Sequence, residues 1–380
     1  MTSKKILYTA TTNIHLLNFH LPYLKWFKSK GYEVHVACNG NPEIPFADKI
    51  FTIPFARMPF DKQNRGAYRQ LKKIIDENHY ELIHCHTPMG GIITRLAARS
   101  ARKKGTKVLY TAHGFHFYKG STLINWLVFF PIEWLFSLIT DAIITINKED
   151  FEVLKSKKFL SKGKFKTDGI GINPSRLEMH KYQDKEKIRQ ELGYENNDFI
   201  ILYIAEFIPR KNHFYIFKSI PEIINRVPNA KFLFAGGKAE LGDTMIKIAK
   251  NNGFEKYINV LGYQTEIGKF IAIADVGISA SHAEGLPIGI AEIMSTKLPV
   301  VISNIRGHNE LVIDGENGFL FDKCDNTYFV DALQKLNDAP KLRIAMGEKG
   351  SQFMEKFVIE IPLQQTILIY EQFLNKEQHV

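Results

Sequence analysis

The sequence predicts an α/β protein built from two doubly wound units, each a parallel β-sheet with helices on both faces. Short apolar runs rich in β-branched residues alternate with longer helical patterns along nearly the whole chain, which is typical of parallel sheets with crossover helices. A chain of 380 residues is also longer than one ordinary hydrophobic core supports, so two domains are expected. Polar residues follow several predicted strands, where such sheets bind their ligands.

The first half supplies five predicted strands and four predicted helices. The strands are Ile6–Thr9, Val34–Cys38, Leu82–His86, Val108–Ala112 and Ala142–Ile146. The helices are centred on His20–Ser29, Ala67–Glu77, Gly90–Lys103 and Leu123–Ile139. A basic run, Lys155–Lys166, and a turn with Gly169, Gly171 and Pro174 then predict a hinge, because two glycines and a proline permit special backbone angles.

The second half repeats the alternation of strands and helices. The strands are Phe199–Ile204, Ala230–Ala235, Tyr257–Leu261, Asp275–Ala280 and Pro299–Ser303. The helices are His213–Arg226, Asp243–Asn252, Ile267–Ala274 and Ile288–Met294, and the tail from Lys341 to Leu374 also has helical spacing. We therefore divide the chain into residues 1–168, 169–355 and a C-terminal helix in 356–380.

Composition favours a protein of the cytoplasm. Hydrophobic residues make up 45% of the chain and charged residues 24%, as in globular proteins. Three scattered cysteines argue against a disulfide framework and a cysteine metal site, and fit a reducing compartment. The short apolar run after Lys4 and Lys5 is too brief for a signal peptide, and no uncharged segment is long enough for a spanning helix.

The positive charge belongs to the first half. Residues 1–180 hold 27 Lys and Arg against 14 Asp and Glu, whereas residues 181–380 hold 23 against 26. Such a field attracts an anionic partner: a phosphorylated substrate, an acidic membrane surface or nucleic acid. The basic residues are dispersed and form no nucleic-acid motif, so nucleic acid is not expected.

The segment Ser281–Ser295 predicts an anion site. It follows a predicted strand, turns at Gly285 and Pro287, and continues as a helix from Ile288, so free N–H groups point at the turn. Glu284 and Glu292 frame this turn, and carboxylates are suited to accept hydrogen bonds from sugar hydroxyls. The alternative is that Glu284 caps the helix and Glu292 lies on its solvated face.

Glu284 and Glu292, with seven residues between them, resemble the E-x7-E signature of the retaining GT-B glycosyltransferases of family 4. Within that group the chain resembles most the bacterial capsular and exopolysaccharide transferases. The resemblance implies two Rossmann-like domains that face each other across a cleft, with a C-terminal helix that packs back on the first. It also implies that Glu284 contacts the donor sugar, that Glu292 binds the ribose, and that the N–H groups of Leu286 and Ile288 face the donor diphosphate.

The same resemblance assigns other donor-binding residues to the second domain. Lys211 matches a family lysine on the diphosphate, whereas Glu206 stands where the family has an arginine. Arg210 is the candidate to replace that missing cation. Gly237 lies in a turn similar to the family's A-G-x-G, and Gly262 and Tyr263 lie where relatives hold the nucleotide base.

Acceptor-side residues are expected after the strands of the first domain. Asn13 and His15 follow the first strand, and His84 and His86 lie at the end of the third. Two such histidines suggest a metal, but no third ligand is in sequence reach, so we expect one of them buried and one facing the cleft.

His113 and His116 follow the fourth strand in a segment that resembles the H-G-F-H-F form of polysaccharide transferases. The resemblance implies that His113 orients the donor sugar or the acceptor hydroxyl and stabilises charge, which makes it a catalytic candidate beside Glu284. The alternative for His113 is that it caps the helix that follows.

Segment Leu123–Ile139 has a single charge, at Glu133, and two interpretations. Its polar residues fall on one narrow stripe: Asn125, Glu133 and Ser137. One interpretation is a core helix of the sheet, kinked at Pro131. The other is a helix that dips into an anionic membrane surface with Trp126 and Trp134 at the headgroups.

The predicted reaction is transfer of a sugar, which we expect to be an N-acetylated amino or deoxyamino sugar, from a UDP-sugar with retention. The expected acceptor is an undecaprenyl-diphosphate-type lipid-linked sugar in capsular or exopolysaccharide assembly, at the inner face of the cell membrane. No metal or other cofactor is expected, because the chain has no D-x-D motif and Arg210, Lys211 and helix N-termini would neutralise the diphosphate. The alternatives are a GT-B nucleotide-sugar epimerase and a non-catalytic donor-binding subunit.

Overall fold

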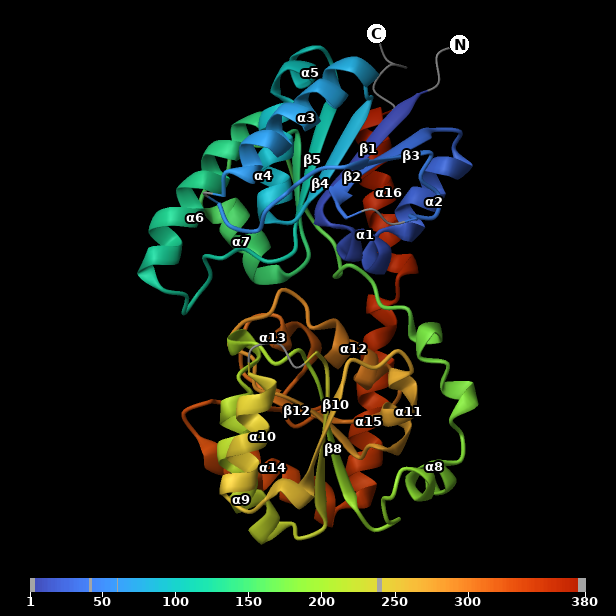
Figure 1. The fold of residues 1–380 in the computed structure, drawn as a ribbon, viewed down its shortest axis with the longest axis vertical. Helices are drawn as coiled ribbons and strands as arrows, with labels where there is room; N and C mark the ends of the chain where they lie inside the picture. Colours follow the sequence, from blue (N-terminus) through green and yellow to red (C-terminus); the bar gives the residue numbers. More distant parts are fainter. Residues whose placement is uncertain (1–3, 41–42, 60, 238–240, 375–380) are drawn as a thin grey trace. The chain divides into compact units, whose positions relative to one another are not determined.

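The computed structural model describes residues 4–40, 43–59, 61–237 and 241–374. The chain divides into two compact units, which we call the first unit (residues 1–171 and 360–380) and the second unit (residues 172–359). Figure 1 shows a parallel sheet with helices on both faces in each of them. The division proposed from the sequence had its borders at residues 168 and 356, and residues 375–380 of its C-terminal segment lie outside the described residues.

The sheet of the first unit has seven parallel strands in the order β3-β2-β1-β4-β5-β6-β7. They are β1 (Lys5–Thr12), β2 (Glu33–Asn39), β3 (Lys49–Thr52), β4 (Leu82–His86), β5 (Lys107–Ala112), β6 (Ala142–Thr145) and β7 (Gly163–Lys166). The five strands predicted from the sequence are confirmed. The edge strands β3 and β7 were missed, because partly exposed edge strands need no apolar run. The basic run Lys155–Lys166 of the predicted hinge ends in β7.

Helices cover both faces of this sheet. They are α1 (Asn13–Phe19), α2 (Leu21–Ser29), α3 (Gln63–Asn78), α4 (Pro88–Ala97), α5 (Arg99–Lys103), α6 (Leu123–Phe136), α7 (Lys148–Ser156) and α16 (Glu360–Leu374). The helix predicted over Gly90–Lys103 is two helices, which meet at Ala98. Although α16 comes from the far end of the chain, Ile369 and Tyr370 are buried in the same core as β1 and α2.

Helix α6 turns its polar stripe inward and its apolar side to solvent. Glu133 and Ser137 are buried, and the Oε2 of Glu133 lies 2.9 Å from the Nη2 of Arg95, which is wholly buried. Trp126 and Trp134 pack against a buried cluster around Phe117. Helix α6 therefore packs on the core of the first unit through this side, with Pro131 inside the helix, and the placement of the two tryptophans on the outer face is wrong. The exposed side consists of aliphatic residues: Leu123, Ile124, Leu127, Val128 and Leu135, followed by Leu138.

The sheet of the second unit has six parallel strands in the order β10-β9-β8-β11-β12-β13. They are β8 (Phe199–Ile204), β9 (Ala230–Ala235), β10 (Ile258–Gly262), β11 (Val276–Ser279), β12 (Val300–Ser303) and β13 (Phe319–Phe321). Its helices are α8 (Lys185–Glu191), α9 (His213–Arg226), α10 (Gly242–Asn251), α11 (Ile267–Ile273), α12 (Ile288–Ser295), α13 (His308–Leu311), α14 (Asn326–Asp338) and α15 (Pro340–Met354). The short strand β13 and the helices α8, α13 and α14 were not predicted.

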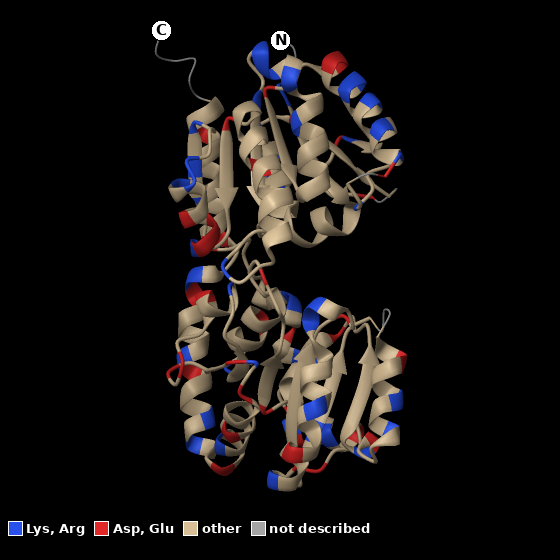
Figure 2. Cartoon of the chain, turned by 90° about the vertical axis from the view of Figure 1, so that its left-hand side faces the viewer, with Lys and Arg blue, Asp and Glu red and all other residues tan. Residues whose placement is uncertain are grey.

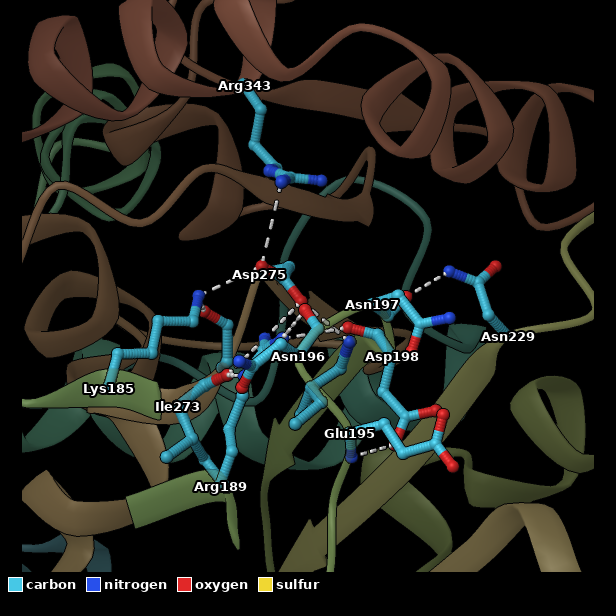
Figure 3. A network of polar contacts seen from close by, with 12 residues as sticks. Lys185, Arg189, Glu195, Asn196, Asn197, Asp198, Asn229, Ile273, Asp275 and Arg343 are labelled. Carbon is cyan, nitrogen blue, oxygen red and sulfur yellow. Dashed lines mark hydrogen bonds and ion pairs between the residues drawn. The ribbon is translucent and has the colours of Figure 1, made fainter. Parts of the chain in front are cut away.

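A charge network at the start of β11 holds this unit together (Figure 3). The carboxylate of Asp275 lies 2.9 Å from Lys185, 2.6 Å from Arg189 and 3.7 Å from Arg343, which come from α8 and α15. Burial by itself raises the pKa of Asp275, but Lys185 and Arg189 bring it below its ordinary value. Because the network lies at the amino end of β11, it leaves the carboxyl end free for a ligand site.

Candidate active site

The loops after β8 and β11 bring one carboxylate and two cations together. Glu284 is buried, its Oε1 lies 2.6 Å from the Nζ of Lys211, and its Oε2 lies 2.7 Å from the Nη1 of Arg210. Burial raises the pKa of Glu284, but Lys211 and Arg210, with a hydrogen bond from Ser281, lower it to about 2. Glu284 is therefore ionised at neutral pH, and the cluster carries one net positive charge.

The loop after β12 fixes the backbone at Glu284. The Nε of Arg306 donates to the carbonyl oxygen of Glu284 at 3.1 Å, and the Oγ of Ser303 donates to the carbonyl of Ser281 at 2.9 Å. Gly307 has a φ of +84°, and a Cβ there would lie 2.8 Å from the carbonyl oxygen of Glu284. Arg306 and Gly307 were not predicted as site residues, although they lie in the loop that follows the predicted strand Pro299–Ser303.

Helix α12 begins at Ile288, and Pro287 is its N-cap instead of its first residue. Glu292, inside this helix, is buried and forms a bidentate ion pair with Arg176. The Nε of Arg176 lies 2.5 Å from the Oε1 of Glu292, and its Nη2 lies 2.9 Å from the Oε2. Burial raises the pKa of Glu292, and Arg176 opposes that shift. Because both Glu284 and Glu292 are buried and paired, the interpretation of the two as a helix cap and a solvated residue is wrong.

The other predicted donor residues lie at neighbouring strand ends. The N–H of Gly236 donates to the carbonyl of Gly262 at 2.8 Å, which joins the ends of β9 and β10 beside Gly237. Tyr263 follows β10 and its side chain is 81% exposed. Glu206 follows β8 and is exposed. The carboxylate that pairs with Arg210 and Lys211 is that of Glu284. Leu286, next to Gly285, is buried.

In the first unit, four histidines converge. His15 and His20 come from α1 and the residue that follows it, His86 ends β4 and His113 follows β5. The Nε2 of His113 lies 3.2 Å from the Nε2 of His15 and 3.3 Å from the Nδ1 of His86. His20 and His86 have ring centroids 3.9 Å apart. We call these four residues the histidine cluster.

The histidine cluster corrects two expectations. His84 and His86 are both buried. Further candidate ligands were not expected, because none is near these two histidines in the sequence. In the structure His15, His20 and His113 lie around His86. No helix starts between His113 and Leu123, so His113 caps none.

Burial keeps the histidine cluster neutral. It lowers the pKa of His15 to about 4, and the pKa values of His20, His86 and His113 lie well below 6.5. Of the other predicted acceptor-side residues, His116 is exposed and stacks on Phe129 of α6. Asn13 begins α1 and its side chain lies against Gly40.

These two parallel α/β units, with an ion-paired carboxylate at neighbouring strand ends, define a GT-B glycosyltransferase. Residues 5–147 match the family described as Glycosyl transferase 4-like, and residues 184–353 match Glycosyl transferases group 1. The chain belongs to this glycosyltransferase family and is a transferase.

A full-length relative is the protein named putative glycosyltransferase EpsD of Bacillus subtilis, 39% identical over 99% of this chain and 98% of that one. The UDP-Gal:alpha-D-GlcNAc-diphosphoundecaprenol alpha-1,3-galactosyltransferase of Escherichia coli is 29% identical over 76% and 74% of the two chains. Among solved structures, Anabaena Alr3699/HepE in complex with UDP and glucose has a TM-score of 0.76 at 17% identity, over 97% and 100% of the two chains. That structural similarity supports the fold.

Proposed function

We propose that the chain transfers a sugar from a UDP-sugar to a hydroxyl of a lipid-diphosphate-linked sugar, with retention at the anomeric carbon. The observation that carries this proposal is the buried Glu284 with Arg210 and Lys211 at the ends of β8 and β11. The donor bond between the anomeric carbon and the diphosphate oxygen breaks, and UDP leaves with the electron pair. The acceptor oxygen attacks from the same face, and its proton passes to the leaving phosphate.

The donor side of the proposal belongs to the second unit. Lys211, Arg210 and the first N–H groups of α12 stabilise the negative charge that develops on the diphosphate. Glu284 accepts hydrogen bonds from the transferred sugar, and Glu292 from the ribose. Because protein cations are already present, we propose that the diphosphate needs no metal ion.

The acceptor side of the proposal belongs to the first unit. His113 orients the reacting groups, and His15 and His86 shape its surroundings. The name of the Escherichia coli relative includes a diphosphoundecaprenol-linked sugar as its acceptor. A similar acceptor for this chain suits assembly of a capsular or related polysaccharide, with an N-acetylated amino or deoxyamino sugar as the group transferred.

A lipid-linked acceptor requires contact with a membrane, which we assign to α6. Its outer side is aliphatic, and Leu123 and Leu127 are 72% and 67% exposed. In Figure 2, Lys and Arg lie on several separate elements of the first unit, and such charges would attract anionic lipid. In the described part of the chain, every helix is too short or too polar to cross a bilayer. We therefore propose peripheral binding at the inner face of the cell membrane.

The reaction is tested by measuring UDP release from a panel of UDP-sugars, with and without a synthetic lipid-diphosphate sugar. Wild type is expected to release UDP only when the acceptor is present, and Glu284→Gln is expected to lose this release. Glu348→Gln, a change of an exposed carboxylate on α15 of the same unit, is the matched control. Release without acceptor would favour an epimerase, and donor binding without any turnover would favour a donor-binding subunit.

Membrane contact is tested by sedimentation with vesicles of phosphatidylglycerol and phosphatidylcholine. A double variant, Leu123→Ser with Leu127→Ser, is expected to bind these vesicles at least about tenfold more weakly, because each lost leucine removes apolar burial. Ile344→Ser is the control, since Ile344 is 60% exposed on α15 of the second unit. Equal binding by the two variants would refute the assignment to α6.

A further inference from the structure

The histidine cluster has the spacing of a metal site. His15, His20, His86 and His113 each offer a ring nitrogen, and these nitrogens all lie within 4.8 Å of one another. Two ligand nitrogens on a tetrahedral zinc ion are about 3.3 Å apart when each zinc–nitrogen bond is about 2.0–2.1 Å. The two contacts of the His113 Nε2, at 3.2 Å and 3.3 Å, match that edge. Binding of an ion would bring the more widely spaced ring nitrogens of the cluster closer together.

Hydrogen bonding alone does not account for these contacts. A neutral imidazole nitrogen either donates one hydrogen bond or accepts with its single lone pair, so the Nε2 of His113 cannot bond fully to two neighbours. Among the described residues, three nitrogens of the cluster are buried without a hydrogen-bond partner: the Nε2 of His20, the Nε2 of His86 and the Nδ1 of His113. An ion on the Nε2 of His113 and the Nδ1 of His86 would leave the other nitrogen of each ring unpaired, so of these three atoms only the Nε2 of His20 is available to it.

His84, which lies beside the cluster, has both ring nitrogens paired. Its Nδ1 lies 2.7 Å from the hydroxyl of Tyr370, and its Nε2 lies 2.8 Å from the hydroxyl of Thr111. His84 packs directly on His86, with ring centroids 4.2 Å apart. Two neighbouring rings on one strand therefore differ: one has both nitrogens bonded to side chains, and the other has a nitrogen left over.

We propose that His15, His20, His86 and His113 bind one divalent transition-metal ion, with Zn²⁺ as the preferred ion. Imidazole ligands suit zinc, copper, nickel and iron, whereas magnesium and calcium prefer oxygen. The four rings are uncharged at neutral pH, which is the form that binds a metal. This is a site in the first unit, in addition to the donor site, whose diphosphate takes its counter-charge from Arg210 and Lys211 of the second unit.

Four protein ligands make a closed site, so the ion positions residues instead of activating water. It joins α1 and the residue after it to the carboxyl ends of β4 and β5, which carry the predicted acceptor-side residues. An ion on the Nε2 of His113 also places that ring's proton on Nδ1, which then becomes a hydrogen-bond donor. The metal thereby sets the tautomer of the proposed catalytic histidine.

The test uses the full chain without a histidine tag. Metal content is measured on the purified protein by mass spectrometry, and metal-free protein is then titrated with Co²⁺ and competed with Zn²⁺. The expected result is one Co²⁺ per chain with the strong visible absorption of a tetrahedral nitrogen site, displaced by one Zn²⁺. Neither readout needs donor or acceptor, so it is independent of the proposed transferase reaction.

The variants His15→Phe and His113→Phe each remove one ligand and keep an aromatic ring, and each is expected to bind Co²⁺ at least about tenfold more weakly. His213→Phe is the matched control, because His213 is buried between Phe207 and Tyr203 in the second unit. Circular dichroism shows which variants fold, and one folded ligand variant is enough. The proposal is overturned if wild type binds no stoichiometric metal, or if the ligand variants bind Co²⁺ as His213→Phe does.

Discussion

The Nζ of Lys211 lies 2.6 Å from the Oε1 of Glu284. These residues are 73 positions apart in the sequence, but β8 and β11 are adjacent strands, so the loops after them meet. Arg210 takes the other oxygen of the same carboxylate. Glu284 therefore holds two cations at the site where a donor diphosphate is proposed to bind, and the cluster retains a positive charge for it.

The first prediction concerns these cations in catalysis. Lys211→Met is expected to lower kcat/KM for UDP-sugar about a hundredfold or more, because a partly buried cation at the proposed diphosphate site would stabilise the charge of the transition state. Steady-state UDP release with acceptor measures the effect. Lys218→Met on α9, where the side chain is exposed, is the control. Similar rates for wild type and Lys211→Met would remove Lys211 from the donor site.

The second prediction concerns pH and the free energy of unfolding. The pKa of Glu284 is about 2 in the folded chain, against an ordinary value of 4.5, so its ion pairs stabilise the fold above pH 4.5. That stability is lost as the pH falls from 4.5 toward 2. Urea denaturation of wild type and Glu284→Gln should therefore differ by about 3 kcal/mol at pH 6, and by progressively less below pH 4.5. A difference independent of pH would contradict the charge pairing.

The third prediction uses two adjacent glycines after β9. A Cβ on Gly236 would lie 2.1 Å from the carbonyl oxygen of Ala205, whereas a Cβ on Gly237 would have its nearest neighbour at 3.8 Å. Gly236→Ala is therefore expected to destabilise the protein by about 1–3 kcal/mol or more, because backbone must move. Gly237→Ala should change stability by only about 0.5 kcal/mol. Chemical denaturation compares the two, and equal stabilities would disprove the close approach.

The fourth prediction concerns the buried ion pair under α6. Glu133→Ala is expected to cost about 3–5 kcal/mol of unfolding free energy, because it leaves Arg95 charged and buried without its partner. The double variant Arg95→Met with Glu133→Leu should be less destabilised than Glu133→Ala, since no buried charge remains. Lys72→Ala, which removes an exposed pair with Asp76, is the control and should leave the denaturation midpoint nearly unchanged, because exposed ion pairs contribute little to stability. Denaturation midpoints decide between these outcomes.

The fifth prediction separates stability from catalysis at the two ends of β11. Asp275→Ala leaves the buried guanidinium of Arg189 without its carboxylate and should cost about 3–5 kcal/mol. The folded fraction of this variant should keep its kcat, because the network is at the opposite end of the strand from Glu284. Denaturation and UDP release on the same preparation measure both quantities. A folded variant without activity would show that the network also shapes the donor site.

Much of the fold was predictable because its central strands are continuous apolar runs. All five strands predicted in each half exist, and apart from the edge strand β10 they are mostly buried strands, which need such runs. The exposed edge strands β3 and β7 lack that pattern and were missed. Helix α6 was predicted as a helix, but the sequence did not show which of its sides faces the core. That depends on the pairing of Glu133 in its polar stripe with Arg95, 38 residues earlier.

The candidate site was likewise predictable only in part from the sequence. The sequence by itself determined that Ser281–Ser295 is a turn and a helix after a strand, with Glu284 and Glu292 in it, and that Lys211 follows a strand end, because these are local patterns. Only the tertiary structure decided that Glu284 binds Lys211 and Arg210, that Glu292 binds Arg176, and that four histidines surround one point. Those partners are brought together by the order of the strands in each sheet. That order depends on burial of the whole core, and no single residue of the sequence indicates it.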